Sequence, residues 1–296
     1  MAAGTGPTVR RRQLMAELKR LRETTGLTQE DVASQLDWHP TKVMRIETGR
    51  TAPHPNDVRV MLGLYGVTDQ DVLAGLIRLA KDARQRGWWY SYRDVLLSRF
   101  EFFIGLESEA DTIRDFELAM IPGLLQTEDY ARALIRGLMA YDAAEIERRV
   151  EVRMTRQQLL AREDRPQLWA ILDEAAVRRV VGGQAIMAAQ LLHLANTAEQ
   201  GRTTIQVLPY GAGPHPGQAG PFIIVGFAEP AEPEVVYMET IGGNLYVDKP
   251  EEVRLYTTAF DQLRAVALSP AQSRAMLQAL AGELGLRTKE GRDEQS

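Results

Sequence analysis

The chain has 296 residues, of which 45% are hydrophobic and 25% charged, and its formal net charge is −5 at pH 7. It contains no cysteine, which excludes disulfides, thiolate metal sites and a cysteine nucleophile. No run of about 18 apolar residues occurs, and the N-terminal end lacks the apolar segment of a secretory signal. We therefore expect a cytoplasmic protein without a membrane span.

Charge is distributed unevenly along the chain. Residues 1–86 contain 14 Lys or Arg and 10 Asp or Glu, a formal charge of +4, so the rest must carry −9 to give the total of −5. A chain of this length can form two domains that each bury a core. The positive charge of the first part suits contact with a nucleic acid.

The chain begins with small and polar residues, and we predict that residues 1–9 are disordered. Apolar residues at helical spacing then predict a helix over residues 10–24, with Leu14, Leu18 and Leu21 on its inner face. Basic residues occupy the outer face of this helix, where a solvated surface and contact with phosphates explain them equally well.

The stretch 27–50 predicts two short helices joined by a tight turn. Thr28 is a typical N-cap residue, and Asp31 stands where a capping box places an acidic side chain. Pro40 suits the first position of the second helix. Gly49 follows that helix at the position where a left-handed C-cap favours glycine.

Both helices of this stretch are amphipathic. Their apolar residues recur at helical spacing: Val32, Ala33, Leu36, Val43 and Ile46. The other face of the second helix carries polar residues suited to phosphate oxygens and base edges: Thr41, Lys42, Arg45 and Thr48. The order of these signals favours a helix-turn-helix, which places one helix in the major groove of DNA, over two unrelated short helices.

The same stretch resembles the helix-turn-helix of the xenobiotic-response-element, or lambda-repressor-like, family. The resemblance is carried by Leu27-Thr28-Gln29-Glu30, Val32-Ala33, Leu36, Val43, Arg45-Ile46-Glu47 and Gly49-Arg50. From the polar face and the resemblance together we expect these residues to contact DNA: Thr28, Gln29, His39, Thr41, Lys42, Met44, Arg45, Thr48 and Arg50.

The resemblance implies different roles within that set. Thr41, Met44 and Arg45 are expected to read bases, and Gln29, Lys42 and Arg50 to contact phosphates. Met44 departs from the small polar residue usual in the family, since it can touch a thymine methyl group but cannot donate a hydrogen bond. The resemblance also implies a structural ion pair between Arg22 and Glu47, which ties the first helix to the third.

Two further helices, over residues 56–65 and 68–86, complete a predicted five-helix, all-α, lambda-repressor-like DNA-binding domain at 10–86. The aromatic run 87–94 is expected to link it to the rest of the chain. That run favours packing between domains over the alternative of an exposed patch for a partner.

The second part of the chain predicts an α+β domain over residues 95–284. It reads as helical to residue 162, with a break at 121–123. Segments bounded by Gly and Pro then predict strands at 167–172, 203–208, 222–227, 235–239 and 244–247. Helices are predicted at 174–181, 184–197 and 251–266. The result is a multidomain chain whose second domain contains a small, mostly antiparallel sheet, followed by a loose tail at 285–296.

The second domain contains a series of five motifs: IPGLLQTEDYARAL (121–134), ERRVEVRMTRQ (147–157), LDEAAVRR (172–179), IQVLPYGAG (205–213) and VDKPEEVRLY (247–256). This series resembles the WhiJ-like C-terminal domain of actinobacterial regulators. The resemblance implies an antitoxin-like transcriptional regulator whose C-terminal domain has poorly defined activity. It also implies a small acidic partner protein, encoded nearby, that modulates DNA binding. It assigns no functional role to any residue of this domain.

The sequence gives little support for catalysis. Some repressors of this class cleave themselves with a Ser–Lys dyad, but the only lysines after Lys81 are Lys249 and Lys289. The four histidines show no metal-ligand spacing. Asp173 and Glu174 are better explained by a helix N-terminus than by acid–base roles. We therefore predict no enzyme activity, no metal and no cofactor.

These features together predict a sequence-specific DNA-binding transcriptional regulator, either a repressor or an autoregulator. It is expected to act as a homodimer on a palindromic operator in double-stranded DNA, and so to be nucleoid-associated when bound. The second domain is expected to dimerise the chain and to bind a small partner protein. Two alternatives stay open: an antitoxin-like interaction module with secondary DNA binding, and a repressor that senses a small-molecule ligand in a pocket behind the loop 211–217.

Overall fold

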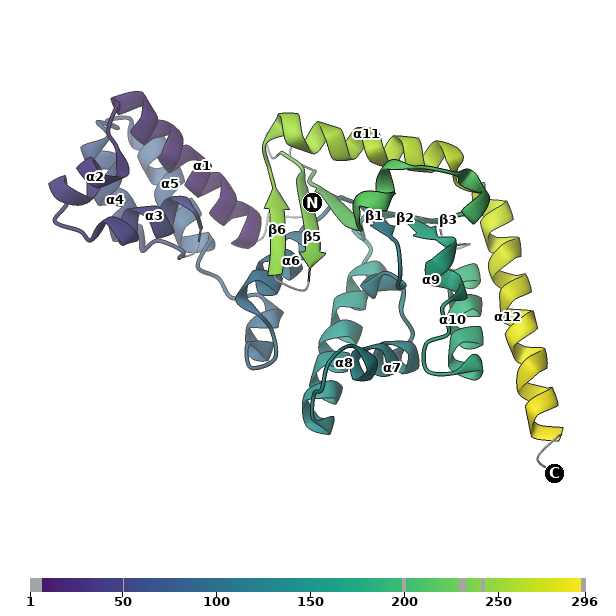
Figure 1. Cartoon of the computed structure of the whole chain (residues 1–296). Coiled ribbons are helices and arrows are strands. Elements are labelled where there is room, and N and C mark those ends of the chain that lie inside the picture. The colour runs from purple at the N-terminus through teal and green to yellow at the C-terminus, as the bar shows by residue number, and fades with distance from the viewer. Residues whose placement is uncertain (1–6, 50, 199–200, 229–232, 241–242, 294–296) are drawn as a thin grey trace. The chain divides into compact units, whose positions relative to one another are not determined.

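The computed structural model of the chain describes residues 7–49, 51–198, 201–228, 233–240 and 243–293 (Figure 1). The chain divides into two compact units. The N-terminal unit consists of residues 1–91 together with 104–109, and the C-terminal unit consists of residues 92–103 together with 110–296. The division falls within the aromatic run, of which Trp88–Tyr92 form a 3₁₀ turn.

Five helices build the first part of the N-terminal unit, as the sequence predicts. They are α1 (Pro7–Thr25), α2 (Gln29–Gln35), α3 (Pro40–Glu47), α4 (Pro55–Leu64) and α5 (Gln70–Asp82). The prediction that residues 1–9 are disordered is wrong for the last three, since α1 begins at Pro7. Residues 1–6 lie outside the described residues.

The early start of α1 is explained by a carboxylate that comes much later in the chain. Glu109 follows α6 (Ser98–Ser108) and accepts hydrogen bonds from the backbone N–H groups of Thr8 and Val9, each at 2.8 Å. The first N–H groups of a helix have no partner within the helix, and a carboxylate there is also favoured by the helix dipole. Burial raises the pKa of Glu109, although these hydrogen bonds oppose the rise.

The core of the N-terminal unit is made by the apolar faces of all five helices. Its buried members are Leu14, Leu18, Val32, Ala33, Val43, Ile46, Val58, Met61, Leu62, Tyr65, Leu76 and Ala80. The apolar residues predicted for the helix-turn-helix are thus buried or packed against this core.

The turn between α2 and α3 depends on a left-handed residue. Asp37 has a φ of 53°, which aspartate adopts more readily than most residues with a side chain. This conformation lets the Trp38 N–H donate to the Ala33 carbonyl at 2.8 Å, as in a Schellman motif. Gly49, which follows α3, also has a positive φ, of 66°.

A six-stranded sheet forms the centre of the C-terminal unit. Its strands are β1 (Thr112–Glu117), β2 (Gln167–Asp173), β3 (Thr203–Leu208), β4 (Phe222–Gly226), β5 (Val235–Thr240) and β6 (Gly243–Val247). Their order is β3-β2-β1-β4-β5-β6. The pairs β1–β2 and β2–β3 are parallel, and the other three are antiparallel. The predicted α+β class and mostly antiparallel sheet are therefore confirmed.

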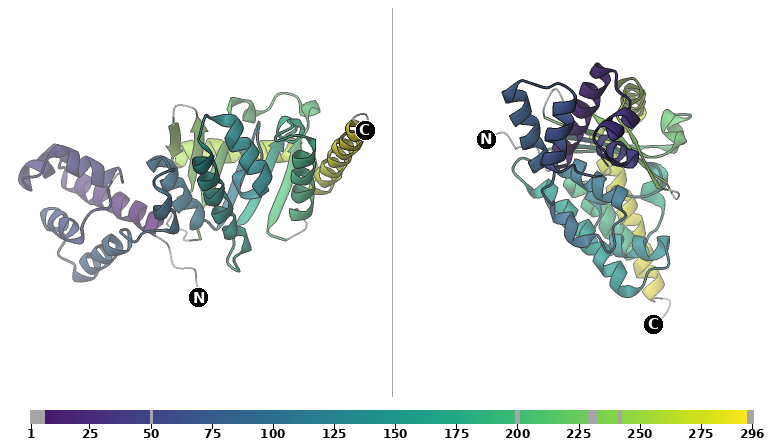
Figure 2. Two further views of the ribbon diagram at one scale, coloured as in Figure 1. Left: turned by 90° about the horizontal axis from the view of Figure 1, so that it is seen from below. Right: turned by 90° about the vertical axis from the view of Figure 1, so that its left-hand side faces the viewer.

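Helices connect the parallel strands, because such strands need a crossover rather than a hairpin. The helices of this unit after α6 are α7 (Glu128–Leu138), α8 (Ala143–Gln157), α9 (Glu174–Arg178), α10 (Gln184–Thr197), α11 (Pro250–Val266) and α12 (Pro270–Asp293). Helix α11 covers one face of the sheet, where it shares a buried cluster with Phe116 and Phe222. Helices α7, α8 and α10 lie on the opposite face (Figures 1 and 2).

Two predictions for this unit are wrong. Residues 112–117, read as part of a helical region, form strand β1, and the loose tail predicted from residue 285 belongs to α12 as far as Asp293. The alternation of β1 was hidden because Asp115, a charged residue, lies on a buried position and is only 4% exposed. Residues 294–296 of the tail lie outside the described residues.

Glu117 shares the face of β1 that carries Asp115. Burial raises the pKa of the Glu117 carboxyl well above its ordinary value. The neighbouring charges of Asp115 and Glu239 add to the rise, and Arg153 opposes it. A carboxyl group in this environment disfavours its own ionised form, so it lowers the stability of the folded chain at neutral pH.

Replacing Glu117 with glutamine is therefore expected to flatten the pH profile of the C-terminal unit. A carboxyl group whose pKa is higher in the folded than in the unfolded chain stabilises the fold at a pH below its pKa in the unfolded chain. This stabilisation is lost as the pH rises through its pKa in the folded chain. The free energy of unfolding of the wild type should accordingly fall as pH rises above 4.5, the ordinary value for the group. Urea titrations over this range measure the effect. Glu163→Gln, at an exposed position, is the control, and identical profiles for both variants would contradict the prediction.

Within the described parts of the chain, no helix combines the length and the apolar character needed to cross a membrane.

Candidate nucleic-acid interface

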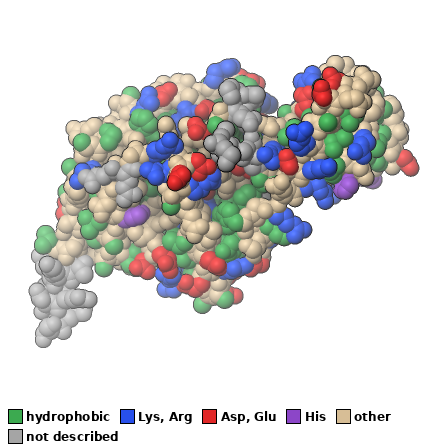
Figure 3. All heavy atoms as spheres, turned by 180° about the vertical axis from the view of Figure 1, so that it is seen from behind, with side chains coloured by type: hydrophobic (Ala, Val, Ile, Leu, Met, Phe, Trp, Pro, Cys, Tyr) green, Lys and Arg blue, Asp and Glu red, His purple; other side chains and the backbone are tan. Residues whose placement is uncertain are grey.

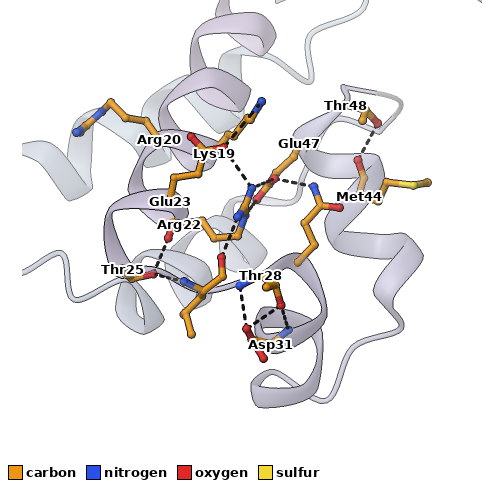
Figure 4. Close-up of polar contacts among 12 residues, drawn as sticks. Lys19, Arg20, Arg22, Glu23, Thr25, Thr28, Asp31, Met44, Glu47 and Thr48 are labelled. Carbon is orange, nitrogen blue, oxygen red and sulfur yellow. Dashed lines mark hydrogen bonds and ion pairs between the residues drawn. The ribbon is translucent and has the colours of Figure 1, made fainter.

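The N-terminus of α2 carries a complete capping box. The Thr28 hydroxyl accepts a hydrogen bond from the Asp31 N–H at 3.1 Å, and the Asp31 carboxylate accepts one from the Thr28 N–H at 2.9 Å (Figure 4). The hydroxyl also donates to that carboxylate at 2.7 Å. These bonds lower the pKa of Asp31. Thr28, predicted to contact DNA, is exposed but uses its hydroxyl to fix the start of α2.

Arg22 and Glu47 form an ion pair that joins α1 to the end of α3 (Figure 4). Arg22 Nε donates to Glu47 Oε1 at 2.7 Å, and a terminal guanidinium nitrogen donates to Oε2 at 3.0 Å. The Glu47 side chain is 1% exposed and that of Arg22 is 11% exposed. The hydrogen bonds with Glu47 raise the pKa of Arg22.

Gln29 extends this ion pair to α2. Its Nε2 donates to Glu47 Oε2 at 2.8 Å, and Arg22 also donates to the Leu27 carbonyl at 2.8 Å, just before α2. One carboxylate therefore joins α1, α2 and α3. An amide nitrogen carries two hydrogens, so Gln29 keeps one donor beyond the bond to Glu47.

The exposed face of α3 carries the residues predicted to read bases. Arg45 is exposed, and Thr41 and Met44 are half-buried, whereas Val43 and Ile46 face the core. Figure 4 shows Met44 directed away from the Arg22–Glu47 pair. The helix is thus held from its inner side while these three side chains remain at the surface.

The ends of α3 are capped by two further residues predicted to contact DNA. His39 is the N-cap, and its Nδ1 accepts the Thr41 N–H at 3.2 Å. The Thr48 hydroxyl donates to the Met44 carbonyl at 2.7 Å. Both are exposed. The remaining predicted contact, Arg50, lies outside the described residues.

Lys42 is held by neighbours that the sequence did not suggest. Its Nζ lies 2.8 Å from Asp57 Oδ1, in the first turn of α4, and 3.6 Å from the centre of the Trp38 ring. No local pattern predicts the pair with Asp57, because the two residues are 15 positions apart in the sequence. Lys42 therefore joins α3 to α4 as well as presenting a positive charge.

A hollow of about 590 Å³ lies beside α3 within the N-terminal unit. Four predicted contact residues line it: His39, Thr41, Lys42 and Arg45. Two residues that the sequence analysis did not single out, His54 and Arg84, also line it. The sequence carries one signal for His54, because His-Pro occurs before α3 as His39-Pro40 and again before α4 as His54-Pro55.

In the C-terminal unit, the carboxylates considered for acid–base roles, Asp173 and Glu174, accept hydrogen bonds from backbone N–H groups. Asp173 caps α9 by accepting the Ala175 N–H at 2.8 Å, and Glu174 accepts the Tyr210 N–H at 2.8 Å. Ser273 Oγ accepts from the Val207 N–H at 2.9 Å. Among the described residues, no three His, Cys, Asp or Glu side chains come together as a metal site.

Comparison with known proteins identifies two domains. Residues 13–75 match a helix-turn-helix domain. Residues 100–279, which are 180 of the 296, match a family described as a domain of unknown function, DUF5753. No curated protein and no solved structure matches the chain. The DUF5753 match spans more than half of the chain, so the chain belongs to the DUF5753 family. It carries a helix-turn-helix domain before that region.

Proposed function

We propose that the protein is a sequence-specific DNA-binding transcriptional regulator with α3 as its recognition helix. The helix-turn-helix domain indicates a DNA-binding regulator. The observation that carries the proposal is the position of α3, which the buried Arg22–Glu47 pair fixes from inside while Arg45 remains exposed. The formal charge of +4 on residues 1–86 supports contact with a polyanion.

In this proposal Thr41, Met44 and Arg45 read base edges in the major groove. Gln29 approaches a phosphate with its remaining N–H, and Arg50 is a further phosphate contact. Lys42 contributes its charge at the surface while Asp57 keeps it in place. No catalytic step is part of the proposal.

We further infer that the DNA-binding domain is of the xenobiotic-response-element type and acts as a repressor or autoregulator. The modest positive charge of this domain supports a homodimer on a palindromic operator, because tight binding needs either two copies of the domain or several well-placed phosphate contacts. The C-terminal domain then provides dimerisation and a surface for a small partner protein, as the resemblance to the WhiJ-like domain of antitoxin-like regulators implies.

The ligand-sensing alternative receives less support from the packing around the loop 211–217. Phe116 is fully buried, and a Cβ added to Gly217 would lie 2.3 Å from its ring. Ala212, also in the loop, packs against the same buried cluster. Protein side chains therefore occupy the region where that alternative places an apolar pocket.

Replacing Arg45 with alanine is expected to weaken binding to the operator by about 1–3 kcal/mol and to affect random DNA much less. Selection from a pool of random duplexes first identifies the operator, and gel shifts then compare both DNAs. Arg78→Ala removes the same charge from an exposed position on α5 and serves as the control. An equal loss on both DNAs would make Arg45 a phosphate contact, and failure to enrich any sequence would refute the proposed function.

The role of the partner is tested on the promoter of the protein's own gene. Gel shifts with and without the small protein encoded beside it separate two cases. A regulator binds this DNA alone and responds to the partner, whereas an interaction module binds the partner tightly and shows little preference for the promoter.

A further inference from the structure

The hollow beside α3 is lined by residues from several segments of the N-terminal unit. Helix α3 provides Arg45 and its N-cap is His39. The connector from α3 to α4 provides His54, helix α4 provides Asp57, and Arg84 follows the end of α5. In the space-filling view, Lys and Arg side chains gather next to histidines on the N-terminal unit (Figure 3). The hollow is therefore a concave surface whose polar walls come from far apart in the sequence.

The two histidines play the same local role. His39 Nδ1 accepts the Thr41 N–H, and His54 Nδ1 accepts the Asn56 N–H, both at 3.2 Å. A neutral imidazole that accepts through Nδ1 carries its proton on Nε2. Each ring therefore keeps an Nε2–H donor while Nδ1 caps its helix, and both residues line the hollow.

The charges of the walls are positive in sum. Lys42, Arg45 and Arg84 are cations, and Asp57 is the acidic residue among the lining residues, which gives a formal charge of +2 with neutral histidines. Asp57 is paired with Lys42 at 2.8 Å. Arg84 donates to the Ala52 carbonyl at 3.3 Å, which places its guanidinium against the connector. The charges of Arg45 and Arg84 thus remain to act on a ligand.

We propose that this hollow binds a phosphate group, and that the phosphate belongs to the DNA backbone beside the bases that α3 reads. Arg84 and the Nε2–H of His54 are the principal donors, and His39 assists from the start of α3. The inference rests on the proposed DNA-binding function. It adds two contacts, His54 and Arg84, that lie outside the helix-turn-helix, and it gives Lys42 the task of positioning α4.

Phosphate fits the walls better than a base edge does. The donors there are N–H groups and cations, and phosphate oxygens only accept hydrogen bonds. Base edges in the major groove present donors as well as acceptors, and the Asp57 carboxylate that would accept from a base is engaged by Lys42. A singly charged phosphodiester is also compatible with a formal charge of +2.

The first test uses the salt dependence of DNA binding by the full chain. Each phosphate contact contributes about 0.9 to the slope of log affinity against log salt. When the salt concentration rises fourfold, the wild type should therefore lose about 3.5-fold more affinity for DNA than Arg84→Gln does. This difference should be the same on operator and random duplexes. Arg84→Lys should restore the wild-type slope, and Arg78→Gln on α5 should leave it unchanged. A wild-type slope in Arg84→Gln would overturn the backbone contact.

A second variant separates the cap from the ligand contact at His54. Serine is a good N-cap residue, so His54→Ser keeps the helix start but removes the ring donor. It should weaken binding to both duplexes by about 2- to 10-fold, the effect of one hydrogen bond. Unchanged binding in a variant with an unchanged melting temperature would exclude His54 as a donor.

The third measurement distinguishes DNA from free phosphate and does not depend on DNA binding. Inorganic phosphate is titrated into the full chain while imidazole resonances are followed by NMR, with chloride at equal ionic strength as the control. A backbone site predicts shifts of His39 and His54 at high phosphate concentration, weakened in Arg84→Gln. If the resonances saturate at low phosphate concentration and Arg84→Gln keeps the wild-type salt dependence of DNA binding, the site binds free phosphate and the backbone assignment is overturned. The absence of both effects would overturn the proposal entirely, whereas shifts in a protein that binds no DNA would refute the proposed function alone.

Discussion

Replacing Glu47 with alanine is expected to lower the free energy of unfolding of the N-terminal unit by about 3–5 kcal/mol, the usual effect of breaking a buried ion pair. Glu47 accepts two hydrogen bonds from Arg22 and one from Gln29. Its loss would leave the largely buried Arg22 guanidinium with weaker partners, such as Glu23 at 3.8 Å. Native-state hydrogen exchange of α1 and α3 measures the effect, because it reports the stability of each segment.

Glu17→Ala is a matched control for this experiment. Glu17 pairs with Arg20 on α1, but the Arg20 side chain is 61% exposed, and exposed pairs contribute little to stability. A loss in Glu47→Ala no larger than in the control would contradict the prediction. The double variant Arg22→Met/Glu47→Leu should recover most of the stability, since apolar residues can replace a buried pair. Because Glu47 lies at the end of α3, the single variant should also weaken operator binding.

Replacing Phe116 with alanine is expected to destabilise the C-terminal unit by about 3–5 kcal/mol. Phe116 is fully buried in β1, with its ring centre 5.7 Å from that of Phe222 and 6.1 Å from that of His215. Removal of the ring takes away buried apolar area and leaves a cavity beneath the loop 211–217. Hydrogen exchange of β1 and β4 measures the loss.

Two companion variants make the Phe116 experiment decisive. Ile113→Val removes one methylene from a buried position of the same strand and should cost about 0.5–1.5 kcal/mol. A loss in Phe116→Ala within that range would refute the prediction. Gly217→Ala should be destabilising in the wild type, where the new Cβ meets the Phe116 ring at 2.3 Å. It should be much better tolerated in Phe116→Ala, because the two sites share one space.

The helix-turn-helix could be predicted because its signals are local. The cap at Thr28, Pro40 at the start of α3 and Gly49 after its end each act within a few residues. The polar face of α3 could be predicted for the same reason. The link from Arg22 to Glu47 needed a family resemblance, because 25 positions separate the two residues and helical spacing does not relate them.

Other features depend on tertiary structure and could not be predicted. Strand β1 contains Asp115 at a buried position, and this residue breaks the alternation that would mark a half-buried strand. Lys42 was expected at a phosphate, but its pairing with Asp57 depends on how α4 packs. Arg84 reaches the hollow only through the fold of α5. The sequence therefore predicted the elements better than the contacts between them.

The bonds from Thr8 and Val9 to Glu109 connect residues about 100 positions apart. Ribosomes add about 5–20 residues per second, so Glu109 is synthesised about 5–20 s after Val9. During that interval the first turn of α1 has to form without its carboxylate partner, even though all five helices have been made. A fragment that ends at Ser91 would remain permanently in this condition. The N-terminal unit is thus completed only when residues 104–109, which belong to it, have been translated.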